Sequence, residues 1–269
     1  MPAILCPSCR KLINSDAARC PFCNQLRPGM FGLTSSLRRL GLRADFPHVI
    51  IVICVALYLL GLALDPGAMF SSSGMLGFLA PSGEVSMSLG MSGAVPVRYY
   101  NRWWTVITAI YLHGGLLHIL FNMMWVRQLG PLVEELFGPF RLVIIFTFSG
   151  ACGFLVSSLM GNHFTLGASG SIFGLLAAAI VYGRQRGAAL FTRQFFQWAV
   201  IMFVFGLLFP GIDNWAHAGG FAGGYASTLA FSRAPRNREE GLGTYLFAGG
   251  CVLLTLLAFA FQFLDVITG

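Results

Sequence analysis

From about residue 48 to its end, the chain alternates long apolar runs with short polar segments. The seven runs span residues 48–64, 115–130, 140–160, 169–183, 195–210, 214–231 and 244–264. Most approach the roughly 20 residues that a helix needs to cross about 30 Å of hydrocarbon. The chain is 56% hydrophobic and only 10% charged, whereas soluble domains carry about 25% charged residues. The pattern therefore predicts an all-α polytopic membrane protein embedded in a lipid bilayer.

The positive charges fall on one side of this predicted bundle. With a cytosolic N-terminus, 15 of the 17 Lys and Arg residues lie in inward-facing segments. The two exceptions, Arg98 and Arg102, lie in the first outer loop. Lys and Arg concentrate on the cytoplasmic side of membrane proteins, so we expect a cytosolic N-terminus and a C-terminus outside. The formal charge of +7 is explained by this topology and requires no nucleic-acid partner, and no cleavable signal peptide is apparent.

A separate module is predicted over residues 1–30, followed by a basic linker over 31–46. Two C-x-x-C pairs, ten residues apart, are formed by Cys6, Cys9, Cys20 and Cys23. Two such pairs can place four thiolates tetrahedrally around a structural Zn²⁺. The alternative is a pair of disulfides or a redox pair, which a cytosolic location disfavours. The module resembles the small zinc ribbons that precede many bacterial membrane domains.

The candidate chemistry centres on Ser169, which lies between Gly167 and Gly170 where a loop must become a membrane helix. The first N–H groups of that helix have no intrahelical partner, and the positive end of its dipole favours an oxyanion. The helix is short: Arg184 lies 15 residues after Ser169, or about 22 Å along the helix. With Arg184 at the inner interface, Ser169 lies in a sunken, outward-open site. The alternative is an N-cap serine followed by small-residue helix packing.

Two further membrane helices carry polar residues at suitable depth. His217 shares one helical face with Gly220 and Gly224, and its imidazole can take the serine proton and return it to a leaving amine. No intramembrane acid lies at its depth, which favours a Ser–His dyad over a triad. His118 and Asn122 lie four residues apart on one face and can donate to an oxyanion. The alternative for this pair is polar bonding between helices.

Three ordered motifs carry a family resemblance. They are H-x-x-x-x-H-x-x-x-N (His113, His118, Asn122), G-x-S-G (Gly167, Ser169, Gly170) and H-x-x-G-x-x-x-G (His217, Gly220, Gly224). Together they resemble the rhomboid intramembrane serine proteases over roughly residues 98–232. The resemblance implies a six-helix core over 47–232, and a cytosolic loop with a seventh transmembrane helix over 233–269. It also implies an integral protein of a bacterial inner membrane, which cleaves transmembrane protein substrates without a catalytic cofactor.

The resemblance also assigns roles to residues. It implies Ser169 as nucleophile and His217 as general base, with His118, Asn122 and Gly167 around the oxyanion and the substrate. Aromatic residues of the second and fifth helices are implied to flank a lateral substrate gate: Phe121, Trp125 and Trp198, with Phe195 and Phe196 beside them. Glu134 is implied to be structural. The chain departs from the family pattern at Thr105, where an arginine is usual, and at Phe173, where a tyrosine is frequent.

Two other function classes remain open at this stage. A non-catalytic binder that escorts or retains membrane proteins would use the same lateral cleft but would tolerate loss of Ser169. An ion or proton carrier is disfavoured, because no polar chain leads from the His/Asn cluster to the inner face.

Overall fold

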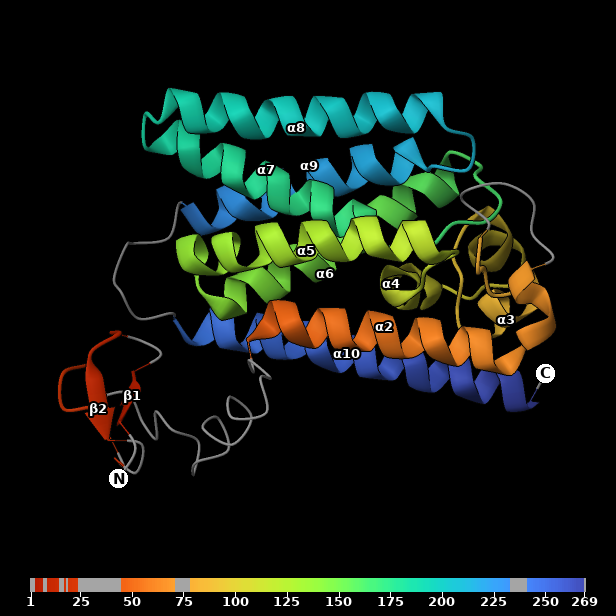
Figure 1. The fold of residues 1–269 in the computed structure, drawn as a ribbon, viewed down its shortest axis with the longest axis horizontal. Helices are drawn as coiled ribbons and strands as arrows, with labels where there is room; N and C mark the ends of the chain where they lie inside the picture. Colours follow the sequence, from red (N-terminus) through yellow and green to blue (C-terminus); the bar gives the residue numbers. More distant parts are fainter. Residues whose placement is uncertain are drawn as a thin grey trace. The chain divides into compact units, whose positions relative to one another are not determined.

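The computed structural model describes residues 3–6, 9–14, 17, 19–23, 45–70, 78–232 and 241–268 (Figure 1). The chain divides into two compact units, Met1–Val49 and Ile50–Gly269. Most of the predicted basic linker, with Arg38, Arg39 and Arg43, lies outside the described residues, as do the loop arginines Arg233, Arg236 and Arg238.

The first unit contains a small β-ribbon. Strand β1 (Ala3–Leu5) pairs antiparallel with β2 (Leu12–Asn14), and Ile4 lies opposite Ile13. Cys6 and Cys20 are buried with Ile13, and Cys9 and Cys23 pack against them. A unit this small buries little apolar surface, so a metal that ties its loops together would supply much of its stability.

The second unit is a helical bundle with a helix at each predicted apolar run. The long helices are α2 (Phe46–Leu64), α5 (Leu116–Phe137), α6 (Pro139–Leu159), α7 (Ser169–Gln185), α8 (Ala189–Leu208), α9 (Asn214–Ser232) and α10 (Leu242–Thr268). Among the described residues, four helices are long and apolar enough to cross a membrane: α2, α6, α8 and α10. A fifth span results if α5 is joined to the preceding segment Thr105–Tyr111, which meets it at 90°. The all-α polytopic fold predicted from the sequence is confirmed.

Helix α7 is the central element of the bundle. It packs against α5, α6, α8 and α9, and Figure 1 shows it between α8 and α5. Its residues from Gly170 to Val181 are all buried. With 17 residues it measures about 25 Å, which is shorter than the hydrocarbon layer. Because neighbouring helices surround α7, most of this short helix contacts protein and not lipid, as a short membrane helix requires.

Glycines set the distance between α7 and α9. A Cβ atom on Gly220 would collide with the backbone of Gly170, and one on Gly224 would collide with the backbone of Gly174. Small residues at such positions allow helix backbones in a membrane to touch. The pair is thereby held close at two points about one helical turn apart.

The segment between α2 and α5, which includes the first outer loop predicted from the sequence, contains short helices: η2 (Pro66–Phe70), α3 (Gly83–Ser88), the π-helix η4 (Val95–Tyr99), α4 (Thr105–Thr108) and η5 (Ala109–Tyr111). Tyr99, Tyr100 and Trp103 are exposed, whereas Trp104 is partly buried and stacks near Phe261 of α10. Thr105, which replaces the expected arginine, is buried, and its hydroxyl donates to the Arg102 carbonyl at 2.7 Å. With threonine in place of the expected arginine, this turn is stabilised by a local hydrogen bond from the side chain of residue 105.

The glycine contacts predict a sharp difference between two kinds of alanine substitution. Gly220→Ala and Gly224→Ala should each destabilise the protein by about 1–3 kcal/mol, the usual cost of overpacking a core. Gly249→Ala is the matched control, since no heavy atom other than those of its chain neighbours and of the nearby backbone of its own helix lies within 4 Å of its added Cβ. It should be neutral or slightly stabilising, because alanine favours helix by about 1 kcal/mol over glycine. Thermal unfolding in detergent measures the difference, and equal effects of all three substitutions would contradict close α7–α9 packing.

Candidate active site

Ser169 is the first residue of α7, with Ala168 at the N-cap position. Gly167 has φ +127°, a backbone conformation that residues with a Cβ rarely adopt. Its N–H donates to the Ala109 carbonyl at 2.9 Å. Two residues earlier, Thr165 forms a bridge with Ser92. The loop before Ser169 is therefore fixed on two sides before α7 begins.

The His217 imidazole lies against the Ser169 hydroxyl. Its Nε2 is 3.0 Å from Ser169 Oγ, and its Nδ1 is 2.9 Å from Asn214 Oδ1. The Phe173 ring stacks on the imidazole with a centroid distance of 4.3 Å and an angle of 17°. His217 is buried. The structure thus brings together two residues 48 positions apart on two neighbouring helices.

Asn214 determines which imidazole nitrogen carries the proton. Its amide nitrogen donates to the Phe203 carbonyl at 3.2 Å, which leaves the amide oxygen facing His217. An oxygen acceptor requires N–H at Nδ1, so Nε2 is left with its lone pair toward the serine. Asn214 is not among the residues to which the sequence motifs assign a role. Its signal was the spacing Asn214-x-x-His217, which places both side chains on one helical face.

Asp213, the nearest acid in the sequence, is used elsewhere. Its carboxylate accepts from the Ala216 N–H at 3.0 Å, which caps α9, and from the Ser157 hydroxyl of α6. Among the described residues, the hydrogen-bond partners of the His217 ring are Asn214 and Ser169. The imidazole is therefore oriented by a neutral amide.

His118 and Asn122 direct nitrogen atoms toward Gly167. A Cβ on Gly167 would lie 2.6 Å from His118 Nε2 and 3.6 Å from Asn122 Nδ2. The Gly114 N–H donates to His118 Nδ1 at 3.4 Å, so Nε2 carries the proton. Asn122 Nδ2 is buried and, in the described part of the chain, has no hydrogen-bond partner. A buried donor without a partner is costly, and here it faces the loop that precedes Ser169.

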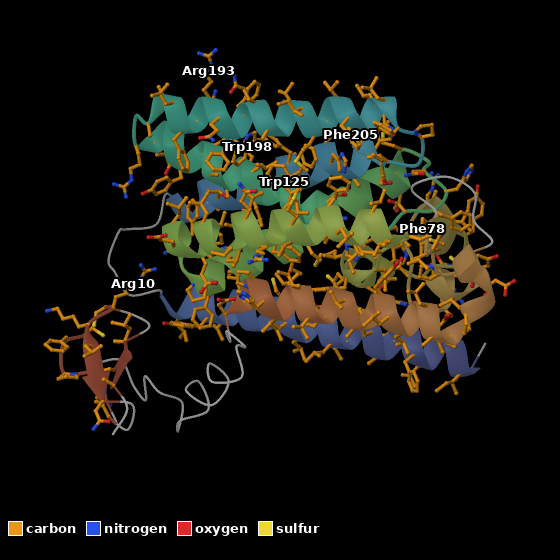
Figure 2. All side chains as sticks on the ribbon, viewed as in Figure 1. Arg10, Phe78, Trp125, Arg193, Trp198 and Phe205 are labelled. Carbon is orange, nitrogen blue, oxygen red and sulfur yellow. The ribbon has the colours of Figure 1, made fainter. Side chains whose placement is uncertain are left out.

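The aromatic residues predicted to form a gate lie partly together. The rings of Trp125 on α5 and Trp198 on α8 meet edge to face at 5.4 Å, and Phe195 touches Trp198 at 5.0 Å (Figure 2). Phe121 lies about one turn before Trp125 and is about half exposed. Helix α8 otherwise packs chiefly on α7. Their role in admitting substrate stays a prediction.

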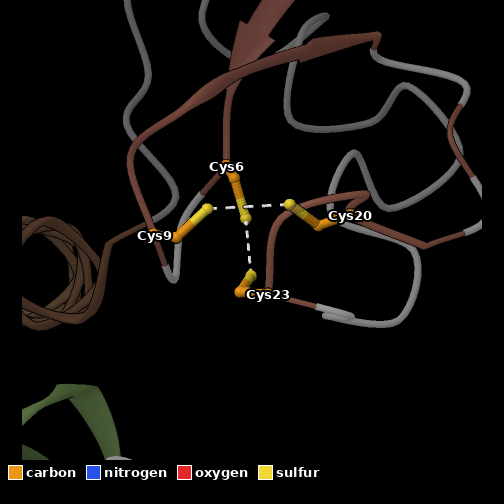
Figure 3. A group of neighbouring side chains, drawn as sticks. All are labelled: Cys6, Cys9, Cys20 and Cys23. Carbon is orange, nitrogen blue, oxygen red and sulfur yellow. Dashed lines mark hydrogen bonds between the residues drawn. The ribbon is translucent and has the colours of Figure 1, made fainter.

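The four N-terminal cysteines form a cluster (Figure 3). Their sulfur atoms all lie within 4.8 Å of one another, with 3.6 Å for Cys6–Cys23 and 3.6 Å for Cys9–Cys20. Four thiolates around tetrahedral Zn²⁺, with Zn–S bonds of about 2.3 Å, would be about 3.8 Å apart. The cluster therefore fits a metal of this size and coordination.

A comparison with protein families decides the classification. The Rhomboid domain model matches residues 100–234, which is half of the chain. The chain belongs to the rhomboid family. The match includes Ser169, His217, His118 and Asn122, while the cysteine cluster precedes it. Membership of this family indicates that the chain is an integral membrane protein related to intramembrane proteases.

Named relatives cover the same core of this rhomboid chain. Rhomboid protease GluP of Bacillus subtilis is 30% identical over 61% of this chain and 32% of its own length. Rhomboid-type serine protease 2 of Emericella nidulans is 34% identical over 53% of this chain and 30% of its own length. RHOMBOID-like protein 1 of Arabidopsis thaliana is 34% identical over 57% of this chain and 42% of its own length. The chain thus spans less than half of the length of each of these three relatives.

The cysteine geometry predicts one bound zinc per chain. Protein purified without chelator should contain about one Zn²⁺, because four thiolates satisfy its preferred coordination. Cys6→Ser and Cys20→Ser should each lower the zinc content strongly, while Cys251→Ala, on α10 and far along the chain, should leave it unchanged. Elemental analysis measures the ratio. Zinc content near zero in the unaltered protein would rule out the site.

Proposed function

We propose that this chain is an intramembrane serine endopeptidase that cleaves transmembrane protein substrates with a Ser169–His217 dyad. The observation that carries the proposal is the 3.0 Å contact between Ser169 Oγ and His217 Nε2, together with the buried Asn122 Nδ2, which has no hydrogen-bond partner in the described part of the chain. A nucleophile, an oriented base and a free donor then stand at one helix terminus. This combination is what acyl transfer requires.

In the proposed first step, Ser169 Oγ attacks the carbonyl carbon of the scissile peptide bond while His217 Nε2 takes the hydroxyl proton. The negative charge forms on the former carbonyl oxygen. When this intermediate collapses, the imidazolium gives its proton to the leaving nitrogen, the C–N bond breaks, and an acyl-serine remains. Water then attacks the ester, with His217 as base again, and the acid product leaves with regeneration of the serine.

The developing oxyanion would be held by three kinds of donor. Asn122 Nδ2 and His118 Nε2 lie beside Gly167, and the first N–H groups of α7 lack intrahelical acceptors. Donors fixed in place before reaction cost no reorganisation when the charge forms. Gly167 contributes space, because any Cβ there would occupy the position next to His118.

The imidazolium that forms transiently would lack a carboxylate partner. Asn214 Oδ1 accepts from its Nδ1–H at 2.9 Å, and the stacked Phe173 ring offers its negative face. Both interactions stabilise the cation less than a carboxylate would. A neutral environment also avoids an unpaired buried charge in the resting protein, which would be costly at this depth.

The charge distribution supports a location for this chemistry. With the N-terminus and the metal cluster in the cytosol and the C-terminus outside, Ser169 faces the outer side of a bacterial inner membrane. Substrate helices would enter laterally between α5 and α8, past Trp125 and Trp198. The zinc site would then be structural, on the side of the membrane opposite to the dyad.

The dyad makes a quantitative prediction for four substitutions. Ser169→Ala and His217→Ala should each remove nearly all cleavage of a transmembrane reporter, and the double variant should be no worse, since the two groups act as a unit. Asn122→Ala should reduce the rate about 10²-fold, the usual loss for one oxyanion donor. Asn214→Ala should reduce it about tenfold, because a misoriented base reacts slowly. Reporter cleavage in detergent measures all four.

Ser171→Ala is the matched control for the nucleophile. Ser171 lies on the same helix, but its hydroxyl is buried and donates to the Phe146 carbonyl at 2.7 Å. A fluorophosphonate should label the wild type and Ser171→Ala but not Ser169→Ala. If Ser169→Ala cleaves the reporter at the wild-type rate, the protease proposal fails and the membrane-protein binder takes its place.

The aromatic contact between α5 and α8 predicts a gain of function. Trp125→Leu or Trp198→Leu should speed reporter cleavage several-fold, since less aromatic surface then holds the two helices together. Labelling by the small fluorophosphonate should change little, because that probe needs no lateral opening. Phe205→Leu on α8 is the control: its ring stacks on Phe209 of the following loop and not on α5. Unchanged cleavage in well-folded tryptophan variants would argue against the gate.

A further inference from the structure

The last helix of the chain carries one buried polar residue in an otherwise apolar stretch. Gln262 of α10 is only 3% exposed. Its side-chain oxygen accepts from Trp104 Nε1–H at 2.8 Å, and its nitrogen donates to the carbonyls of Met87 at 3.2 Å and Ser88 at 3.0 Å. An isolated polar group inside a membrane helix indicates a specific role. Here one amide joins α10 to two separate parts of the first outer loop.

An ion pair reinforces the same contact three residues later. Asp265 lies 2.7 Å from Arg102, and each side chain is about one quarter exposed. Because residues three apart share a helical face, Gln262 and Asp265 bind the loop from one side of α10. Ring contacts Trp104–Phe261 and Tyr111–Phe259, both at 6.0 Å, extend this interface.

The loop held by Gln262 leads to Ser169 by a short chain of hydrogen bonds. Just after Ser88, the Gly90 carbonyl accepts from the Thr108 hydroxyl at 2.7 Å. Ser92 then exchanges backbone hydrogen bonds with Thr165, at 3.0 and 2.8 Å. Thr165 is four residues before Ser169. The carbonyls that Gln262 binds are therefore connected to the segment that precedes Ser169.

A second route starts at Trp104, the N-cap residue of α4. Helix α4 continues into η5, whose first residue, Ala109, accepts the Gly167 N–H at 2.9 Å. Gly90 permits the close meeting of these parts: it has φ +103°, and a Cβ there would collide with Thr108 and lie 3.3 Å from the Gln262 side chain. Both routes from the single Gln262 amide end at the loop of residues 165–167.

We propose that Gln262 and Asp265 make α10 a positioning element of the Ser169 site, which fixes the loop of residues 165–167 through the segment 87–92 and through α4. The effect on catalysis rests on the proposed protease function. The effect on the loop itself does not. Neither residue touches the reacting atoms, so loss of the contact displaces the nucleophile and the oxyanion donors relative to each other.

The first test measures the loop without using activity. In a Ser169→Ala background, Gln262→Met keeps the length and removes the polar atoms, and Gln185→Met, at the exposed end of α7, is the matched control. Hydrogen exchange of the Ser92 and Thr165 amides should be about tenfold faster in Gln262→Met and unchanged in Gln185→Met. Unchanged exchange in a folded Gln262→Met protein overturns the proposal, whether or not the chain is a protease.

The second test uses the active protein and separates positioning from general destabilisation. Gln262→Met should lower kcat for a transmembrane reporter about tenfold, since small misplacements of reacting groups are costly, with KM within twofold. Fluorophosphonate labelling of Ser169 should slow by a similar factor. A rise in KM alone would overturn the positioning role, because it would place the effect on substrate entry.

Asp265→Asn tests the same contact with a milder change, in case the Gln262→Met protein does not fold. It keeps the shape of the side chain and weakens only the ion pair with Arg102, so it should give a smaller change of the same kind in exchange and in kcat. Arg102→Ala should then add little to Asp265→Asn, because the two residues share one interaction. Additive effects of the two substitutions would contradict the contact. If the wild type is inactive while Gln262→Met speeds exchange, the proposed function fails and the loop contact stands.

Discussion

The close approach of α7 and α9 is the constraint on which the rest of this structure depends. The backbones touch at Gly170–Gly220 and again at Gly174–Gly224, where any Cβ would separate them. Only at this distance does the first turn of α9 bring His217 Nε2 to 3.0 Å from Ser169 Oγ. A helix that makes such contacts on several sides can also be shorter than the bilayer, because protein surrounds the loop at its N-terminal end.

The site built on this contact uses neutral groups throughout. Asn214 orients the imidazole, Phe173 covers its face, and Asn122 supplies a buried donor with no partner in the described part of the chain. In a low-dielectric interior, resident charges would be costly, whereas fixed dipoles act on charge only as it forms. The acid next to the histidine, Asp213, is accordingly used for capping and for contact with Ser157.

The seventh helix joins this site through polar contacts at its far end. Arg102 is one of two positive residues that depart from the predicted charge asymmetry of the chain, and its pairing with Asp265 gives a reason for its presence in the predicted outer loop. Gln262 and Asp265 thus tie a helix outside the family-matched segment of residues 100–234 to the loop before Ser169. An appended helix can in this way become part of the scaffold it flanks.

The sequence by itself determined the seven helices, because the length of each apolar run is a local signal. The C-x-x-C spacing likewise determined the four-cysteine module, and the ordered motifs gave Ser169 and His217 as a candidate pair. It also placed Gly220 and Gly224 on one helical face with His217. The partners of single polar groups were decided only by the tertiary structure. Asn214 and Gln262 each bond to residues brought near by packing, and the 90° bend before α5 interrupts a span that hydropathy alone treats as straight. Such choices depend on which backbones come close in space, and spacing along one chain does not contain that information.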